Sequence, residues 1–273
     1  MNSLSPYAPT TLEEAEAFLK RTPAKIEDRG QVIDAVNAAV GWMEGKNGAN
    51  RRLVARTYRD PVTFAGLLDG TALVTGILIG AAAKVYDDVV GEGLAPGSRV
   101  EAIASTQNSL TLNSAATVSG SSSLSFGSAP LQIDGEGSRT FYLGEWPIVA
   151  VYSARSLDSE GTASALDLTG LRLERETGRV ILMNDSAPLG LMNLEVEAAC
   201  GYRRPTATER GDPSDWGALQ RICHRLCQCY FQDWANAVGR VADKSLGSAN
   251  FRFVDFEPPK DVLDGIAAYR RLW

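Results

Sequence analysis

The residues of this chain with the clearest capacity for chemistry lie between positions 223 and 229, where the sequence reads C-H-x-x-C-x-C. Thiolate and imidazole groups are common zinc ligands, and Cys223, His224, Cys227 and Cys229 would supply four of them. The surrounding residues have helical periodicity, so Cys223 and Cys227 share a face while the other two point away from it by about 100° and 240°. Four ligands on such a helix cannot converge on one ion. We expect no metal site here and interpret these cysteines, with Cys200, as reduced and buried apolar side chains.

Other catalytic arrangements are missing from the sequence as well. His224 is the only histidine, so a Ser-His or Cys-His pair has no credible base. The chain has no phosphate-binding loop of the pattern G-x-x-x-x-G-K-[ST] and no H-E-x-x-H motif. The glycines at 91–97 do not match a dinucleotide fingerprint, and the adjacent acids Asp87 and Asp88 are typical of a solvated face. We therefore expect a non-enzymatic protein with no catalytic residues, no cofactor and no metal.

The composition limits the classes of partner. The 273 residues are 44% hydrophobic and 22% charged, and the formal net charge is −6. Binding DNA over a whole surface needs clustered lysine and arginine, so this balance argues against it, while a passing contact with DNA stays open. The start of the chain does not read as a signal peptide, and the longest apolar run, 72–83, is shorter than the roughly 20 residues of a membrane helix. We expect a cytosolic, soluble product that enters no membrane.

One arginine-rich segment has two interpretations. Residues 51–60 read RRLVARTYRD and contain four arginines among apolar residues. Such a strip would suit nucleic acid or another partner, but it also suits an exposed strand or helix extension. We favour the exposed structural segment, because only the number of arginines is unusual.

The segment that must position the candidate residues is 216–241, the clearest helix in the sequence. Its apolar residues recur at spacings of three and four and form one stripe: Leu219, Ile222, Cys223, Leu226, Tyr230, Phe231, Trp234, Val238 and Val241. Burying about nine such side chains contributes roughly 1.5–3 kcal/mol each before the entropy cost. We expect two N-terminal helices, one after the capping box at 11–14 and one over 28–45, to pack on it and form a helical bundle.

Between residues 61 and 137 the sequence takes on β character. Asp69-Gly70 and Pro96-Gly97 are turn signals, and residues 102–133 contain no charge. Polar and apolar residues alternate over 109–112 and 123–126, as expected for strands with one face covered. We interpret this range as an inserted small all-β domain rather than a flexible linker.

Further strands are expected between the insert and the long helix. Residues 171–175 and 180–183 flank a Thr177-Gly178 turn and predict a β-hairpin. The predicted fold class is α+β, with a helical bundle core, antiparallel strands and a hairpin, the all-β insert and a C-terminal arm. We divide the chain into a core (1–60 and 138–245), the insert (61–137) and the arm (246–273). The arm carries an apolar face without an obvious cover: Phe251, Phe253, Val262, Leu263, Ile266, Tyr269 and Trp273.

The order of these segments resembles the head-tail connector, or adaptor, proteins of long-tailed bacteriophages. The similarity covers roughly residues 10–60 and 140–245. It rests on four motifs: LEEAEAFLK at 12–20, W-P-I-x-x-V-x-S at 146–153, GRVIL at 178–182 and the exit V-x-A-A-C-G-Y-x-x-P at 196–205 before the long helix. The family's exit usually reads Y-x-A-G-Y, and related proteins often have a short connection in place of the insert. Residues 90–100 and 109–112 resemble a small β-module that recurs in phage structural proteins.

The resemblance implies a structural protein of the virion neck, assembled in the host cytoplasm. Its copies would form a homo-oligomeric ring, commonly twelve-fold, beneath the portal protein, and would extend the DNA channel. The ring would contact passing DNA only transiently and offer a platform to the stopper or tail-completion protein. The resemblance also implies that the arm binds the portal through the seven apolar residues named above.

The polar face of the long helix supplies the other candidate contacts. We expect Arg221, Arg225 and Gln228 to make ring or channel contacts. Two alternatives stay open: another neck or tail-completion ring protein, and a binding module whose β-insert recognises carbohydrate.

Overall fold

The computed structural model describes residues 4–5, 7–19, 26–76, 83–95, 97–106, 108–204, 213–241 and 258–270. The chain divides into two compact units. The helical unit comprises Met1–Leu53 and Arg204–Trp273, and the β-rich unit comprises Val54–Arg203. The predicted limits at 61 and 137 both lie inside the β-rich unit, and the division into three domains stays a prediction. Within the described residues, every helix is too short or too polar to traverse a lipid bilayer.

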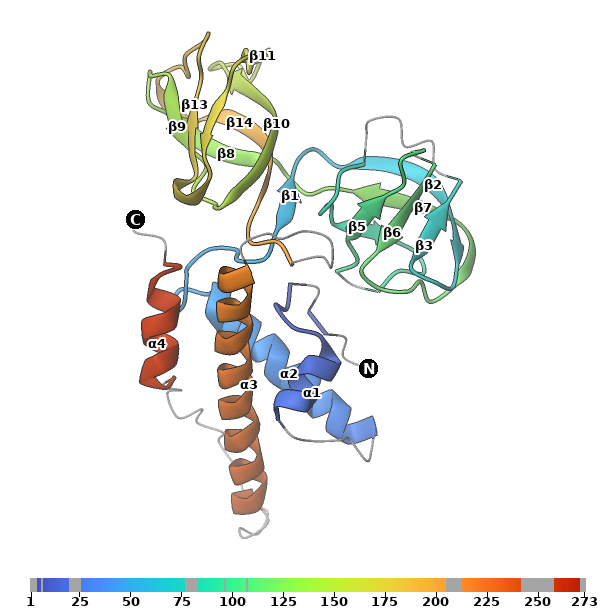
Figure 1. Ribbon diagram of the computed structural model, residues 1–273. Coiled ribbons are helices and arrows are strands. Elements are labelled where there is room, and N and C mark those ends of the chain that lie inside the picture. The colour runs from blue at the N-terminus through green and yellow to red at the C-terminus, as the bar shows by residue number, and fades with distance from the viewer. Residues whose placement is uncertain are drawn as a thin grey trace. The chain divides into compact units, whose positions relative to one another are not determined.

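The helical unit is built around its longest helix. Its described helices are α1 (Leu12–Phe18), α2 (Ile26–Glu44), α3 (Pro213–Val241) and α4 (Lys260–Ala267) (Figure 1). The other three all contact α3. The predicted stripe is confirmed for Leu219, Ile222, Cys223, Leu226 and Phe231, which are buried, while Tyr230 is half-buried. The side chains of Trp234, Val238 and Val241 lie outside the described residues.

Local sequence signals explain where α1 begins. The Thr11 hydroxyl accepts a hydrogen bond from the Glu14 amide at 3.2 Å, and the Glu14 carboxylate accepts one from the Thr11 amide at 2.7 Å. The predicted capping box is therefore present, and it satisfies two amides at the helix start.

Residues 62–126 contribute a six-stranded antiparallel sheet to the β-rich unit, in the order β4-β7-β2-β3-β6-β5. The predicted alternation is confirmed, because Leu110, Leu112, Leu124 and Phe126 are buried in its core while Thr111 is exposed. The strands are β2 (Val62–Asp69), β3 (Leu73–Thr75), β4 (Val89–Gly91), β5 (Val100–Ile103), β6 (Ser109–Leu112) and β7 (Ser119–Phe126).

The remaining strands form two further sheets over a second core. In the five-stranded sheet, β14 (Gly190–Cys200) pairs with β1 (Arg56–Tyr58), β8 (Leu131–Gly135) and β10 (Ile148–Leu157), and β10 pairs with β11 (Ala163–Ala165). The three-stranded sheet has the order β12 (Arg172–Glu174), β13 (Arg179–Ile181), β9 (Thr140–Tyr142). A short 3-10 turn, Arg175–Thr177, joins β12 to β13, so the predicted hairpin is confirmed.

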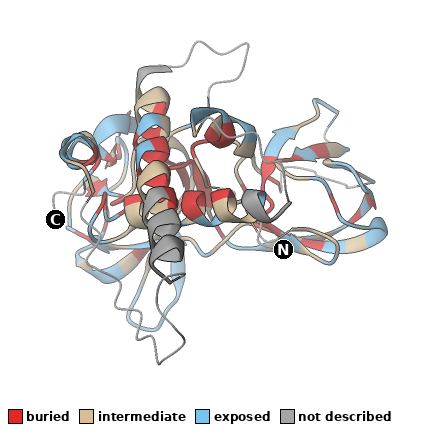
Figure 2. Cartoon of the chain, turned by 90° about the horizontal axis from the view of Figure 1, so that it is seen from below, coloured by how far each residue is buried: buried red, intermediate tan, exposed pale blue. Residues whose placement is uncertain are grey.

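The α+β class is confirmed, but the predicted helical bundle core is wrong. The described residues form four α-helices, and the strands bury their apolar faces in antiparallel sheets that have separate cores. Buried residues are accordingly spread over helices and strands alike (Figure 2). An antiparallel sheet needs cover on one face only, so it does not depend on a central helix for its burial.

Two expectations about charged residues are also overturned. Asp87, expected on a solvated face, is fully buried and paired with Arg59. The segment 51–60 is not an exposed strip, because Arg51, Arg56 and Arg59 are buried and only Arg52 among its arginines is exposed. Local composition does not predict that an arginine stem is buried or that its guanidinium is paired with a distant carboxylate.

Candidate functional site: the α3 surface and the C-terminal helix

The cysteines of the C-H-x-x-C-x-C motif lie on two sides of α3. Cys223 and Cys227 are buried, as predicted, and Cys229 is half-buried. Burial raises the pKa of the Cys223 thiol and raises the pKa of Cys227 to about 12, so both stay protonated and unreactive. In the part of the chain that the structure describes, no group of three or more His, Cys, Asp or Glu side chains is placed to hold a metal.

His224 attaches α1 to α3. It is buried, its Nε2 lies 2.7 Å from the Thr10 hydroxyl, and its ring stacks on Phe18 with 4.8 Å between centroids. Helical spacing predicted that His224 lies away from the apolar stripe, and it did not predict this contact. The only signal was the apolar face of the first predicted helix, which had to be covered by some part of α3.

The pKa values around this contact are shifted in a way that affects stability. Burial lowers the pKa of His224, and the nearby Glu14 opposes this only in part. Burial alone would raise the pKa of Glu14, but the bond from the Thr11 amide and the charge of Arg204 lower it. The native contact therefore favours a neutral imidazole beside an ionised carboxylate.

We expect the helical unit to lose stability as the pH falls below about 6.5, the pKa of histidine in an unfolded chain. Over this range the unfolded chain takes up a proton and the folded chain, with its lowered His224 pKa, does not. Glu14 adds a further loss of stability, which begins as the pH falls below the usual glutamate pKa of 4.5 and continues until the pH has fallen through the lowered pKa of Glu14 in the folded chain. The measurement is the thermal unfolding midpoint across pH. His224→Gln, which can still bond Thr10, should remove the dependence near neutrality, and a variant that keeps it would contradict this assignment.

The apolar face of the predicted arm is covered within the same unit. Val262, Ile266 and Tyr269 are buried, whereas Leu263 is 39% exposed. A Cβ on Gly265 would lie 3.2 Å from a side-chain carbon of Ile222, so glycine permits the close approach of α4 to α3. The expectation of an uncovered face is therefore wrong for these three residues, which are buried where α4 packs against α3. Phe251, Phe253 and Trp273 lie outside the described residues.

Polar contacts fasten the end of α4 to the loop that follows α2. Arg51 donates from Nε to the Tyr269 carbonyl at 2.7 Å. Arg270 donates to the carbonyls of Gly48 at 3.1 Å and Asn47 at 2.8 Å. Together with the apolar contacts, these bonds hold α4 in one place on the unit.

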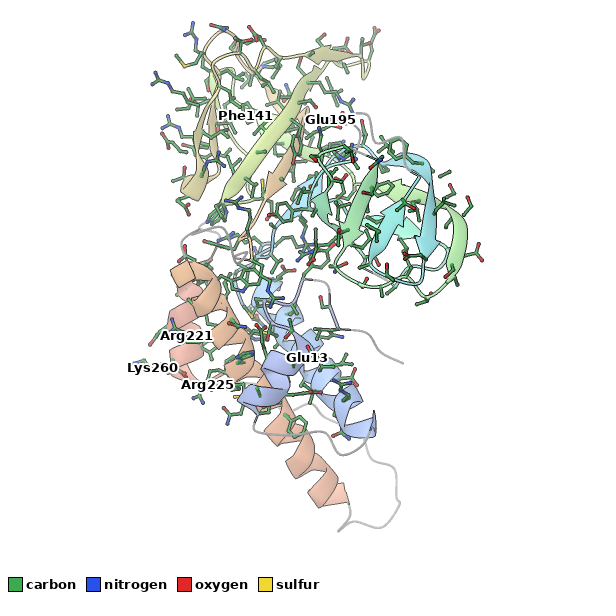
Figure 3. All side chains as sticks on the ribbon, turned by 45° about the vertical axis from the view of Figure 1, so that its right-hand side comes forward. Glu13, Phe141, Glu195, Arg221, Arg225 and Lys260 are labelled. Atoms are coloured by element: carbon green, nitrogen blue, oxygen red, sulfur yellow. The ribbon has the colours of Figure 1, made fainter. Side chains whose placement is uncertain are left out.

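The predicted ring or channel residues lie on the outer surface of the same helices. Arg225 donates to the Asp261 carboxylate of α4 at 3.2 Å and to the Gln228 side chain at 3.1 Å. Arg221 is exposed, and Figure 3 shows it on the same side of the helical unit as Arg225 and Lys260. The ion pair is half-exposed and contributes at most about 1 kcal/mol. The structure thus brings Arg225 and Gln228 together, and the contact role of all three residues stays a prediction.

Comparison with known proteins finds few likenesses. No family model matches the sequence, and no curated protein matches it. One similar structure is described as "Neck of empty GTA particle computed with C6 symmetry", with 11% identity and a TM-score of 0.40, covering 100% of this chain and 94% of that chain. Another, "Virion of native gene transfer agent (GTA) particle", has 14% identity and a TM-score of 0.41, covering 99% and 94%. TM-scores of this size do not establish a common fold.

Proposed function

We propose that this protein is a non-enzymatic head-tail connector of a tailed phage-like particle. Its copies form a ring beneath the portal in the virion neck, extend the DNA channel and carry the stopper or tail-completion protein. The two similar structures come from the neck and virion of a gene transfer agent particle, but the proposal rests on the sequence motifs and their placement.

The observation that carries the proposal is the structural role of the exit motif at 196–205. Val196, Ala198 and Cys200 are buried in β14, where the strand lies between β1 and β10. Gly201 has φ +114, and a Cβ there would come within 2.7 Å of the backbone of Val54 and Ala55. The Tyr202 carbonyl accepts the Ala55 amide at 3.0 Å. The small residues and the glycine of the motif are therefore what this crossing of backbones needs.

The residues of the arm have two different roles. Val262, Ile266 and Tyr269 hold α4 on α3, so they affect portal binding only by fixing the position of the helix. The exposed Leu263, with Phe251, Phe253 and Trp273, makes the portal contact. Arg221, Arg225 and Gln228, on the outer surface of α3, make ring or channel contacts.

The test measures binding of the protein to purified portal. Negative-stain imaging of the protein, alone and with the portal, shows whether it forms rings. The full-length protein is expected to form rings or bind portal, and removal of residues 250–273 to abolish portal binding. Because this truncation also exposes the stripe of α3, Leu263→Asp in the full-length chain is the sharper variant. We expect it to weaken portal binding on the order of 10-fold or more, while Leu67→Asp, at a similarly exposed position in β2, has no effect. Unimpaired binding by the truncation would show that the arm does not anchor the ring.

A further inference from the structure

Residues 188–192, which are the two residues before β14 and its first three, expose large apolar side chains close together. Leu189 is 80% exposed, Leu191 84% and Met192 53%. Single exposed apolar residues are ordinary on protein surfaces, whereas a contiguous group marks a site of interaction. We call this segment the apolar loop. Nothing in its sequence periodicity had distinguished it.

Polar contacts hold the apolar loop in one conformation. The Met192 amide donates to Asp134 at 2.7 Å. The Asn193 side chain accepts the Gly135 amide at 2.8 Å and donates to the Pro188 carbonyl at 3.1 Å. The loop is thus clamped to the end of β8, and its leucines are held in solvent rather than free to collapse onto the sheet.

The backbone conformation of this segment is itself unusual. Met192 has φ +49, a left-handed conformation that residues other than glycine rarely adopt. A Cβ on Gly135 would collide with the Pro188 carbonyl oxygen. Position 135 of β8 must therefore be glycine for β8 to lie this close to residue 188. Unfavourable backbone conformations persist where the surrounding structure enforces them, commonly at binding sites. A loop already fixed in this way loses little conformational entropy when a partner binds.

The charged residues that neighbour the apolar loop in the sequence, and those of the segment that pairs with it, are acidic. Asp134, Glu136 and Asp185 are the charged residues of the segments 131–137 and 183–193, and Arg139 is the first basic residue beyond them. Gly190 pairs with Gly135, and a Cβ on Gly137 would lie 3.4 Å from Leu189, so the acidic segment runs beside the leucines. Such a border complements Lys and Arg on a partner and repels both anionic lipid and a second copy of the same loop.

We propose that the apolar loop inserts into an apolar pocket bordered by Lys or Arg on a different protein. Leu189 and Leu191 fill the pocket, and Asp134 and Glu136 face its basic border. The interaction is independent of the connector function, because it requires neither a ring nor a portal.

The first experiment identifies what covers the loop in the cell. In the full-length chain, Leu191 is replaced by a photo-reactive phenylalanine derivative. The variant is crosslinked inside host cells that also produce its natural partner proteins, and the crosslinked site on the partner is mapped. The control carries the same replacement at Leu67, an exposed leucine of β2. We expect a crosslink from position 191 to one other protein, at an apolar site beside Lys or Arg, and not from position 67.

The second experiment measures affinity for the purified partner. Leu189→Ser with Leu191→Ser is expected to weaken binding on the order of 100-fold or more, whereas Leu67→Ser with Leu73→Ser leaves it unchanged. Affinity should also fall as salt is raised, because the border contacts are screened. All four leucines are exposed, so the thermal unfolding midpoints of both variants should match the parent protein.

Several results would overturn the proposal. A crosslink to a second copy of this chain would make the loop a self-association site, and leucine-dependent binding to phosphatidylcholine–phosphatidylglycerol vesicles would make it a membrane contact. A partner site without Lys or Arg, or equal crosslinking from positions 191 and 67, would also contradict it. A partner outside the virion neck would leave this inference standing and count against the connector function.

Discussion

Replacing Asp87 by alanine is expected to lower the free energy of unfolding of the β-rich unit by about 3–5 kcal/mol. The Asp87 side chain is fully buried and accepts hydrogen bonds from Arg59 at 2.9 and 2.6 Å and from the Lys84 amide at 2.7 Å. Burial raises the pKa of Asp87, and the bonds from Arg59 and the amide act against this. Alanine would leave the buried Arg59 guanidinium without its counter-charge, which costs more than the lost hydrogen bonds.

The control removes both charges together. In the double variant Arg59→Met with Asp87→Leu, no buried charge is left unpaired, so most of the lost stability should return. Asp60→Ala supplies a surface comparison, since Asp60 pairs with Arg155 while half-exposed and should contribute at most about 1 kcal/mol. Urea unfolding followed by circular dichroism measures all three. If the double variant were as unstable as Asp87→Ala, the cost would come from packing rather than from the unpaired charge.

The elements that the sequence predicted well are those determined by neighbouring residues. The stripe of α3 repeats every three or four positions, and β6 and β7 alternate, so each pattern is contained in one segment. The β12–β13 hairpin is also local, because its turn at Gly178 has φ +70, a conformation suited to glycine. The start of α1 follows from a capping box of four residues.

The features that could not be predicted from the sequence depend on residues far apart in the chain. The sequence around Asp87 predicts an acid on the surface, whereas the fold places Arg59, 28 positions away, beside it. The Tyr269 carbonyl accepts its hydrogen bond from Arg51, at a separation of 218 positions. His224 likewise acquires its partner, Thr10, from the other end of the chain, 214 positions away. Such contacts have no periodicity that a single sequence displays.

The candidate site shows the same contrast. Helical spacing correctly placed Arg221 and Arg225 on the exposed side of α3, four residues apart. The same reasoning left the face of α4 without a partner, although Ile222 of the predicted stripe covers it beside Gly265. An amphipathic segment shows that a cover is needed, but not whether the cover comes from the same chain. The apolar loop shows the opposite difficulty. A leucine in the sequence is expected to be buried, and nothing local indicates that Leu189 and Leu191 are exposed.

Replacing Ile266 by alanine is expected to weaken the attachment of α4 to α3 by about 2–5 kcal/mol. Ile266 is completely buried, and α4, at eight residues, is too short to be stable without packing. The loss should therefore appear as local opening of α4 rather than as unfolding of the whole unit. Amide hydrogen exchange over residues 260–267 should accelerate roughly 30-fold or more.

Leu263→Ala provides the matched control for this local opening. It shortens a side chain of the same helix on its exposed side, so exchange in α4 should stay close to that of the parent protein. The pair of variants also separates the two roles proposed for the arm. Ile266→Ala should weaken portal binding by releasing α4, together with faster exchange, whereas Leu263→Ala should weaken it with exchange unchanged. Unchanged exchange in Ile266→Ala would mean that the bonds from Arg51 and Arg270, and not apolar packing, hold the helix.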